Sequence, residues 1–352
     1  MVDAFSWLAR GRAPGRFMLA AAVAAGGLAL AMAPAAAQTE LRLSTFVPPG
    51  HIIYREIIEP WAQQVNEETN GEVTITLYPS MQLGGSPPEL IRQVQEGTVD
   101  LVFTLPGYTS PAFPRTQMIE LPGLKEDGLA ATDMMWDLLE GGLLDPEYDG
   151  LKVIALWGAE DAGLMTREPP IRSMDDVQGL IMRSPSAAQA RQLERMGATP
   201  VAMPVTEVYP QIERGVINGA MIPFTTILDF RLGEVANYFT IAGPVFGRSS
   251  FVIVLNEDSY NGLSPEAQEV IDRTSGRELS RKATQAYLDR AAEAVESVRN
   301  VEGKEVIELS EEEQDRIRET LRPIVDEWLG EMEAAGIDGR AMLDAAGYQD
   351  GN

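Results

Sequence analysis

Residue types that commonly carry catalysis are scarce in this sequence. It has no cysteine and a single histidine, His51, among 352 residues. Thiol catalysis, disulfides and cysteine-built zinc or iron–sulfur sites are therefore excluded, and a Ser-His-Asp triad would depend on His51 alone. No G-x-S-x-G elbow, Walker P-loop or G-x-G-x-x-G loop is present. The sequence predicts a protein that is not an enzyme.

Carboxylates, in contrast, are abundant: 53 acidic residues stand against 28 basic ones, for a formal net charge of -25. Glu160-Asp161 follows an expected strand and could form part of a metal site, but two adjacent acids are weak evidence in so acidic a chain. We therefore expect no metal and no cofactor. The negative charge also argues against binding nucleic acid or anionic lipid.

Strand-like and helix-like segments alternate along the chain and must position any site. Leu41 and Leu43 alternate with polar residues, as do Val73, Ile75 and Leu77, which is typical of strands. The apolar residues between these two segments recur at helical spacing instead. By the same criteria we predict strands at 40–46, 73–78, 99–105, 152–157, 180–183, 216–222 and 251–255, and helices at 52–69, 89–96, 128–139, 187–196 and 207–214.

The C-terminal third is expected to be helical. Ser264 followed by Pro265 is a strong helix start, and one amphipathic helix is predicted from there to about Val298. Its length, without a sustained heptad pattern, indicates a strut lying across domains rather than a coiled coil. Ser310 with Glu313 forms a capping box for a further helix that reaches about Ala335.

The order of these elements predicts parallel βαβ units arranged in two α/β lobes. Open α/β sheets bind ligands at the carboxyl ends of their strands, so we expect a site in the cleft between the lobes, which closes by a hinge. Lobe I is expected at 38–160 with a returning segment at about 249–288. Lobe II is expected at 161–248, completed by C-terminal helices at about 289–352, and the segment 167–170 is a plausible crossing between the lobes.

The first 37 residues are interpreted as a secretory signal peptide. Three arginines precede an apolar run at 17–33, and Ala35-Ala36-Ala37 offers a cleavage site before Gln38. A membrane anchor is the alternative, but the run is at the short edge of what spans a bilayer and no second such run follows. We expect export to the periplasm by the general secretory route, because no twin-arginine pair is present.

Short motifs occur in a fixed order along most of the expected mature chain. They are Gly71-Glu72-Val73, Tyr78-Pro79, Gln82-Leu83-Gly84, Gly97-Thr98-Val99-Asp100, Glu120-Leu121-Pro122, the run from Asp176 to Arg183, the run from Met196 to Val201, Glu207-Val208-Tyr209, and the run from Gly215 to Gly219. Each motif is weak by itself, but their order and spacing are specific. Together they resemble the motifs of the solute-binding subunits of TRAP (tripartite ATP-independent periplasmic) transporters, the DctP-type family.

The resemblance implies a two-lobe periplasmic binding protein fold with mixed sheets, an interlobe ligand cleft and long C-terminal bridging helices. It implies a small organic acid as ligand and delivery to a small and a large integral membrane subunit driven by an ion gradient. Arg183 matches the family's carboxylate clamp. A guanidinium suits this role because its planar fork of donors matches a carboxylate, and such a contact contributes roughly 1.5–3 kcal/mol.

The sequence departs from better-known members at several polar positions. Ile222 stands before Pro223 where those members carry an asparagine, no second arginine follows Trp157, and the chain near Thr104 adds no charge. We interpret this as a cleft with fewer polar anchors and more apolar wall, suited to a monocarboxylate with an apolar or aromatic body, or to a 2-oxo acid. The candidate ligand-binding residues are Arg183, Ser186, Trp157, Tyr108, Met221, Phe224, His51, Phe46 and Thr104.

Simpler roles remain open for several of these residues. Met221 and Phe224 could be core residues, His51 could serve the start of a helix, and Ser186 could cap the helix beginning near Ala187. Alternatives also remain for the whole protein: a carboxylate-sensing or scavenging module with a separate partner, the periplasmic component of an ATP-driven importer, or an enzyme using two carboxylates. No pair of acids shows a spacing that supports the last.

Overall fold

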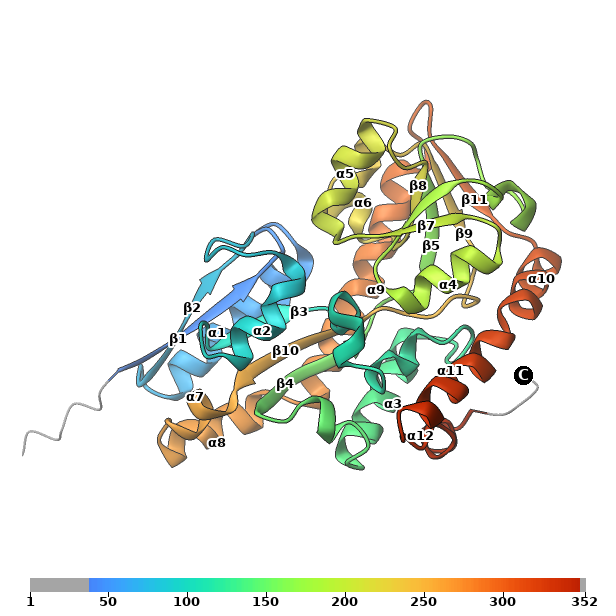
Figure 1. Cartoon of the computed structure of the whole chain (residues 1–352). Helices are drawn as coiled ribbons and strands as arrows, with labels where there is room; N and C mark the ends of the chain where they lie inside the picture. Colours follow the sequence, from blue (N-terminus) through green and yellow to red (C-terminus); the bar gives the residue numbers. More distant parts are fainter. Residues whose placement is uncertain (1–37, 349–352) are drawn as a thin grey trace, which may run out of the picture. The chain divides into compact units, whose positions relative to one another are not determined.

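The computed structural model describes residues 38–348. The expected signal peptide at 1–37 lies outside this range. The described chain forms two mixed sheets covered by helices, so the predicted α/β class is confirmed (Figure 1). No helix within residues 38–348 is both long and apolar enough to cross a bilayer.

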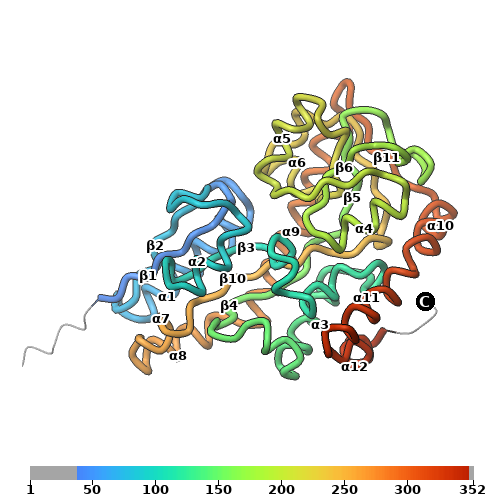
Figure 2. The backbone as a smooth tube through the Cα atoms, in the orientation of Figure 1, coloured from blue at the N-terminus to red at the C-terminus, as the bar shows by residue number. Residues whose placement is uncertain are grey.

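The first sheet has the strand order β2-β1-β3-β10-β4. Strand β1 pairs in parallel with β2 and β3, whereas β10 returns late in the chain to pair antiparallel with β3 and β4 (Figure 2). Its strands are β1 (Thr39–Thr45), β2 (Val73–Tyr78), β3 (Leu101–Thr104), β4 (Leu151–Gly158) and β10 (Ser250–Asn256). The accompanying helices are η1 (Tyr54–Ile58), α1 (Glu59–Glu68), η2 (Pro87–Glu89), α2 (Leu90–Gln95), η3 (Pro106–Ala112), η4 (Thr116–Glu120), α3 (Gly128–Glu140), η5 (Asp145–Glu147), α7 (Glu257–Asn261) and α8 (Pro265–Thr274). We call this sheet and these helices the first lobe.

The second sheet has the order β11-β9-β5-β8-β6-β7, with β5 antiparallel to both β8 and β9. Its strands are β5 (Ala162–Thr166), β6 (Ile181–Ser184), β7 (Thr199–Ala202), β8 (Gly219–Pro223), β9 (Tyr238–Ile241) and β11 (Glu305–Glu308). The accompanying helices are η6 (Met174–Val177), α4 (Ala187–Arg195), α5 (Val205–Glu213), α6 (Thr226–Asp229) and η7 (Leu232–Glu234). We call this sheet and these helices the second lobe. The chain enters it between Gly158 and Ala162, so the segment 167–170 is not the crossing that its prolines suggested.

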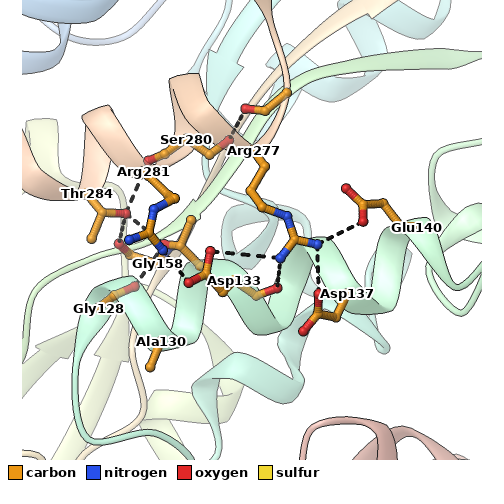
Figure 3. A network of polar contacts seen from close by, with 12 residues as sticks. Gly128, Ala130, Asp133, Asp137, Glu140, Gly158, Arg277, Ser280, Arg281 and Thr284 are labelled. Carbon is orange, nitrogen blue, oxygen red and sulfur yellow. Dashed lines mark hydrogen bonds and ion pairs between the residues drawn. The ribbon is translucent and has the colours of Figure 1, made fainter.

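Helix α9 (Arg277–Arg299) is tied at its start to the first lobe. Arg277 donates to Asp137 at 2.7 Å and to Glu140 at 2.8 Å on α3 (Figure 3). Thr284 shares a 2.7 Å hydrogen bond with Thr132, also on α3. Its later residues contact α6 and β11 of the second lobe. One helix therefore spans both lobes, as the sequence predicted for this region.

The predicted helix from Ser264 to Val298 is wrong in one respect, because it is broken between α8 and α9. Gly276 adopts a φ of +94°, a conformation that L residues with a side chain rarely adopt, and its N–H donates to the carbonyl of Ile154 at 2.7 Å. A glycine with positive φ cannot continue an α-helix, so the chain turns there and α9 starts afresh.

The last predicted helix is likewise divided, into α10 (Glu311–Leu321) and α11 (Pro323–Ala334), and α12 (Gly339–Ala345) follows. Pro323 lacks the N–H that would continue α10 and stands instead at the first position of α11. Helix α11 forms ion pairs with α4 through Glu327 and Glu331, and α12 packs on α3. The four strands β5, β7, β9 and β11 were not predicted.

Candidate functional site

A cavity lies where the two lobes meet, next to α9. Residues from the first lobe, from the second lobe and from α9 all contribute to its wall. The lining residues are Phe46, His51, Leu105, Tyr108, Arg183, Pro185, Val205, Ile222, Pro223, Thr225, Thr226, Phe230, Ser249, Phe251 and Tyr287.

Arg183 stands near the carboxyl end of β6 with only 2% of its surface exposed. Its Nε donates to the carbonyl of Met203 at 2.9 Å, and Nη1 points to the carbonyl of Met221 at 3.5 Å. Within residues 38–348 no carboxylate lies at ion-pair distance from this guanidinium. Burial lowers the pKa of Arg183 from its ordinary value, yet arginine remains charged in proteins. A buried cation without a counter-charge is costly, so this position favours an anion.

Tyr108, from η3 of the first lobe, sits beside Arg183. Its hydroxyl oxygen accepts a hydrogen bond from the N–H of Val205 on the second lobe at 3.0 Å. Burial raises the pKa of Tyr108, so the hydroxyl keeps its proton and can donate it. The two lobes are therefore linked directly beside the guanidinium, by a group that could donate to the same anion.

Aromatic rings form much of the remaining wall. Phe46 of the first lobe and Phe230 of the second lie nearly parallel, with their centroids 6.3 Å apart and an interplanar angle of 12°. Phe251 contacts Tyr287 at 5.0 Å between centroids. Planar apolar faces on several sides of a cavity suit a flat apolar ligand body.

His51 lies at the turn between β1 and η1 and is buried against Phe230 and Tyr287. Burial lowers its pKa from 6.5 to about 4, so the ring is neutral at pH 7; Asp229 opposes this shift and Arg290 adds to it. Its Nδ1 accepts a hydrogen bond from the N–H of Ile53 at 3.2 Å, which places the proton of the neutral ring on Nε2. His51 thus serves the helix start and also lines the cavity.

Four of the nine candidate residues line the cavity: Arg183, Tyr108, His51 and Phe46. Trp157 is fully buried and stacks on Phe251 at 5.7 Å, one layer behind the wall. Met221 is buried on β8 and takes part through its carbonyl oxygen, which faces Arg183.

Three other candidates lie elsewhere. Ser186 caps α4 by accepting from the N–H of Gln189 at 3.1 Å and donates to the buried carboxylate of Glu120. Phe224 covers Gly163 in a separate groove beside α9. The hydroxyl of Thr104 is buried on β3 without a hydrogen-bond partner.

Sequence reasoning missed three aromatic wall residues: Phe230, Phe251 and Tyr287. Phe251 opens a strand that was predicted, but nothing in the strand pattern marks which end meets the cleft. Tyr287 is the only aromatic residue in α9, and an isolated aromatic on an alanine-rich helix was the available signal. Within residues 38–348 no group of three or more histidine, aspartate or glutamate side chains is placed to hold a metal ion.

Comparison with known protein families gives one match that covers most of the chain. The model of the family described as bacterial extracellular solute-binding protein, family 7 (DctP), matches residues 43–331. A similar curated protein is the ectoine/5-hydroxyectoine-binding periplasmic protein of Ruegeria pomeroyi. It is 27% identical over 334 residues, which cover 92% of this chain and 94% of the relative.

Similar solved structures include two TRAP solute-binding proteins. The first, from an unidentified marine microbe, is described as specific for aromatic acid ligands and was crystallised with 3-hydroxybenzoate. It shows 28% identity and a TM-score of 0.82 over 88% of this chain and 97% of its own. The second, from Rhodoferax ferrireducens, holds copurified benzoate, with 28% identity and a TM-score of 0.82 over 88% of this chain and 96% of its own. These likenesses confirm the predicted two-lobe fold.

Proposed function

The chain belongs to family 7 of the bacterial extracellular solute-binding proteins, the DctP type that serves TRAP transporters, and on that premise we propose that its ligand is a monocarboxylate with an aromatic body. Members of this family bind small organic acids for transport and are not enzymes. What the family membership leaves open is which acid this chain takes and which residues hold it.

The observation that carries the proposal is the state of Arg183. Its guanidinium is buried in the cavity wall, held by main-chain carbonyl oxygens, and has no carboxylate partner among the described residues. A carboxylate ligand would supply the missing charge in a bidentate contact. The hydroxyl of Tyr108 beside it would donate a further hydrogen bond.

The rest of the cavity wall favours a ligand with a flat apolar body rather than a ligand with a second charged group. Rings of Phe46, Phe230 and Phe251 line it, and Arg183 is the one arginine or lysine in its lining. A dicarboxylate would need a second cation, and Arg290, near His51, is already paired with Asp229 at 2.8 Å. Two similar TRAP proteins hold benzoate and 3-hydroxybenzoate, which are acids of the proposed class.

In the proposed role the protein captures the acid in the periplasm and passes it to the small and large membrane subunits of a TRAP transporter. The N-terminal arginines and apolar run would direct its export, and the periplasmic relative supports the same compartment. Helix α9 would act in the hinge, because it is bonded to both lobes.

A thermal-shift and calorimetry screen tests the ligand class. Benzoate, phenylacetate and mandelate represent aromatic monocarboxylates, pyruvate a 2-oxo acid, and succinate a dicarboxylate. We expect the aromatic acids to raise the melting temperature by mass action, and succinate to leave it unchanged. A shift with succinate and none with any aromatic acid would overturn the proposal.

A further inference from the structure

Two polar side chains in the cavity have hydrogen-bonding capacity that nothing in the protein uses. Tyr287 lines the cavity and is 2% exposed, yet its hydroxyl has no hydrogen-bond partner within residues 38–348. Nε2 of His51 carries a proton but lies 3.8 Å from its nearest acid, Asp229 Oδ2, which is beyond a hydrogen bond. Buried polar groups without partners are uncommon, and in a ligand cavity they indicate groups that the ligand satisfies.

These two groups lie together and are distinct from the guanidinium. The rings of His51 and Tyr287 meet edge to face with centroids 6.0 Å apart. Two stacked rings separate them from Tyr108, which stands beside Arg183. Tyr108 contacts Phe46 at 5.8 Å, Phe46 stacks on Phe230 at 6.3 Å, and Phe230 contacts His51 at 5.4 Å between ring centroids.

We propose that His51 and Tyr287 form a second subsite that binds a hydroxyl group on the ring of the ligand, so that the preferred substrates are hydroxylated aromatic monocarboxylates. This inference rests on the proposed function, because it presupposes a carboxylate at Arg183 and an aromatic ring between the two ends. A phenolic hydroxyl accepts from the Nε2–H of His51 and exchanges a hydrogen bond with the hydroxyl of Tyr287.

The surrounding charges select a neutral group at this end. Asp229 and Glu160 are both buried near Tyr287, so a second carboxylate would meet repulsion in a poorly solvated place. An ammonium group finds no free acid in the cavity wall: Asp229 already accepts from the N–H of Ile52 at 3.0 Å and from Arg290, and Glu160, whose Oε2 has no partner, lines a separate groove. The ammonium would also face the Nε2–H donor of His51. A hydroxyl both donates and accepts, and it carries no charge.

Calorimetry with benzoate, 3-hydroxybenzoate and 4-hydroxybenzoate tests the subsite. In the unmodified protein we expect at least one hydroxybenzoate to bind about 3- to 10-fold more tightly than benzoate, the effect of one net hydrogen bond. Tyr287→Phe removes only the hydroxyl and should reduce this ratio to near one. Tyr108→Phe, at the carboxylate end, should weaken all three acids by a similar factor and keep the ratio. Tyr209→Phe, whose hydroxyl bonds Glu234 on the surface, is the matched control with unchanged affinities.

The outcomes separate this inference from the ligand class. If benzoate binds and neither hydroxybenzoate binds more tightly, or if Tyr287→Phe keeps the ratio, the subsite is rejected and the monocarboxylate proposal stands. If none of the three acids binds, the proposed function fails together with the subsite. Melting temperatures of the variants without ligand establish that each is folded.

Discussion

The carboxylate of Asp229 on α6 accepts a hydrogen bond from the N–H of Ile52, 177 positions earlier in the chain, at 3.0 Å. Its other oxygen accepts from Nε of Arg290 on α9 at 2.8 Å. One buried side chain thus joins three parts of the chain: the segment after β1 in the first lobe, helix α6 of the second lobe, and helix α9, which spans both lobes. This junction lies next to His51 at the cavity wall.

The junction predicts a strong effect of Asp229 on stability. Asp229→Ala should lower the free energy of unfolding by about 3–5 kcal/mol, because Arg290 and the N–H of Ile52 lose a partner in a buried place. Denaturant unfolding measures the change. Asp289→Asn alters an exposed acid two positions from Tyr287 on the same helix and should cost less than about 0.5 kcal/mol. Equal losses in the two variants would show that the junction contributes nothing specific.

The buried ring of His51 should make the free energy of unfolding depend on pH below neutrality. Its pKa is lowered by burial from 6.5 to about 4, so between these values the unfolded chain binds a proton that the folded chain does not. Stability should therefore rise with pH from about 4 to 6.5, by up to about 3 kcal/mol, and be lost as pH falls through this window. His51→Asn, which keeps an acceptor near the N–H of Ile53, should remove this part of the slope. Identical pH profiles of the two proteins would contradict the burial of a neutral His51.

The buried carboxyl group of Glu120 should make the stability depend on pH with the opposite sign. It is buried between the lobes, where Ser186 donates to it, and burial raises its pKa from 4.5 to about 7. The folded chain then binds a proton that the unfolded chain has lost, so stability should fall as pH rises from about 4.5 to 7. Glu120→Gln should be more stable than the unmodified protein at pH 8, by up to about 3 kcal/mol, and similar to it at pH 4. Thermal unfolding at both values measures this, with the exposed Glu126→Gln as a control; a variant that gains nothing at pH 8 would contradict the prediction.

Much of the fold could be predicted from local patterns. Alternation found β1 and β2, and capping residues found the starts of α8 and α10, because these signals depend on neighbours in the sequence. The short strands β9 and β11 were not predicted, although β3 and β6 are equally short and were; over four residues the alternation of apolar and polar residues identifies some strands and not others. The break at Gly276 was missed because a single glycine within an amphipathic stretch does not reveal its φ angle.

The lining of the cavity was harder to predict than the fold. Four predicted residues line it: Arg183 was chosen because its motif fixes its place at the end of a strand, and Phe46, His51 and Tyr108 because they follow strand ends where a cleft is expected. Phe230 reaches the cavity from the turn after α6 and Tyr287 from α9, and which side chains of a turn or a helix meet a cleft depends on how the lobes pack. Trp157 and Phe251 are paired on neighbouring strands with their rings stacked, and only the packing of the lobes decides that Phe251 and not Trp157 lines the cavity.

The last prediction concerns Arg183 itself. Arg183→Met keeps a long flexible side chain but removes the charge and the donors, so aromatic monocarboxylates should bind about 10- to 150-fold more weakly, as expected for a charged hydrogen bond of about 1.5–3 kcal/mol. Arg183→Lys should be weakened as well, because an ammonium cannot make the bidentate contact. Calorimetry with benzoate provides the measurement.

The melting temperature of the ligand-free protein measures a second effect of replacing Arg183. Because the guanidinium is buried without a counter-charge, its removal relieves a cost of burial, and the melting temperature of ligand-free Arg183→Met should not fall below that of the unmodified protein. Arg195→Met on α4 removes a surface arginine that pairs with Glu327 and should leave affinity unchanged. Benzoate affinity in Arg183→Met equal to that of the unmodified protein would remove this residue from the site. A large drop in its ligand-free melting temperature would mean instead that the guanidinium is a structural group, because its bonds to the carbonyls of Met203 and Met221 would then outweigh the cost of its unpaired charge.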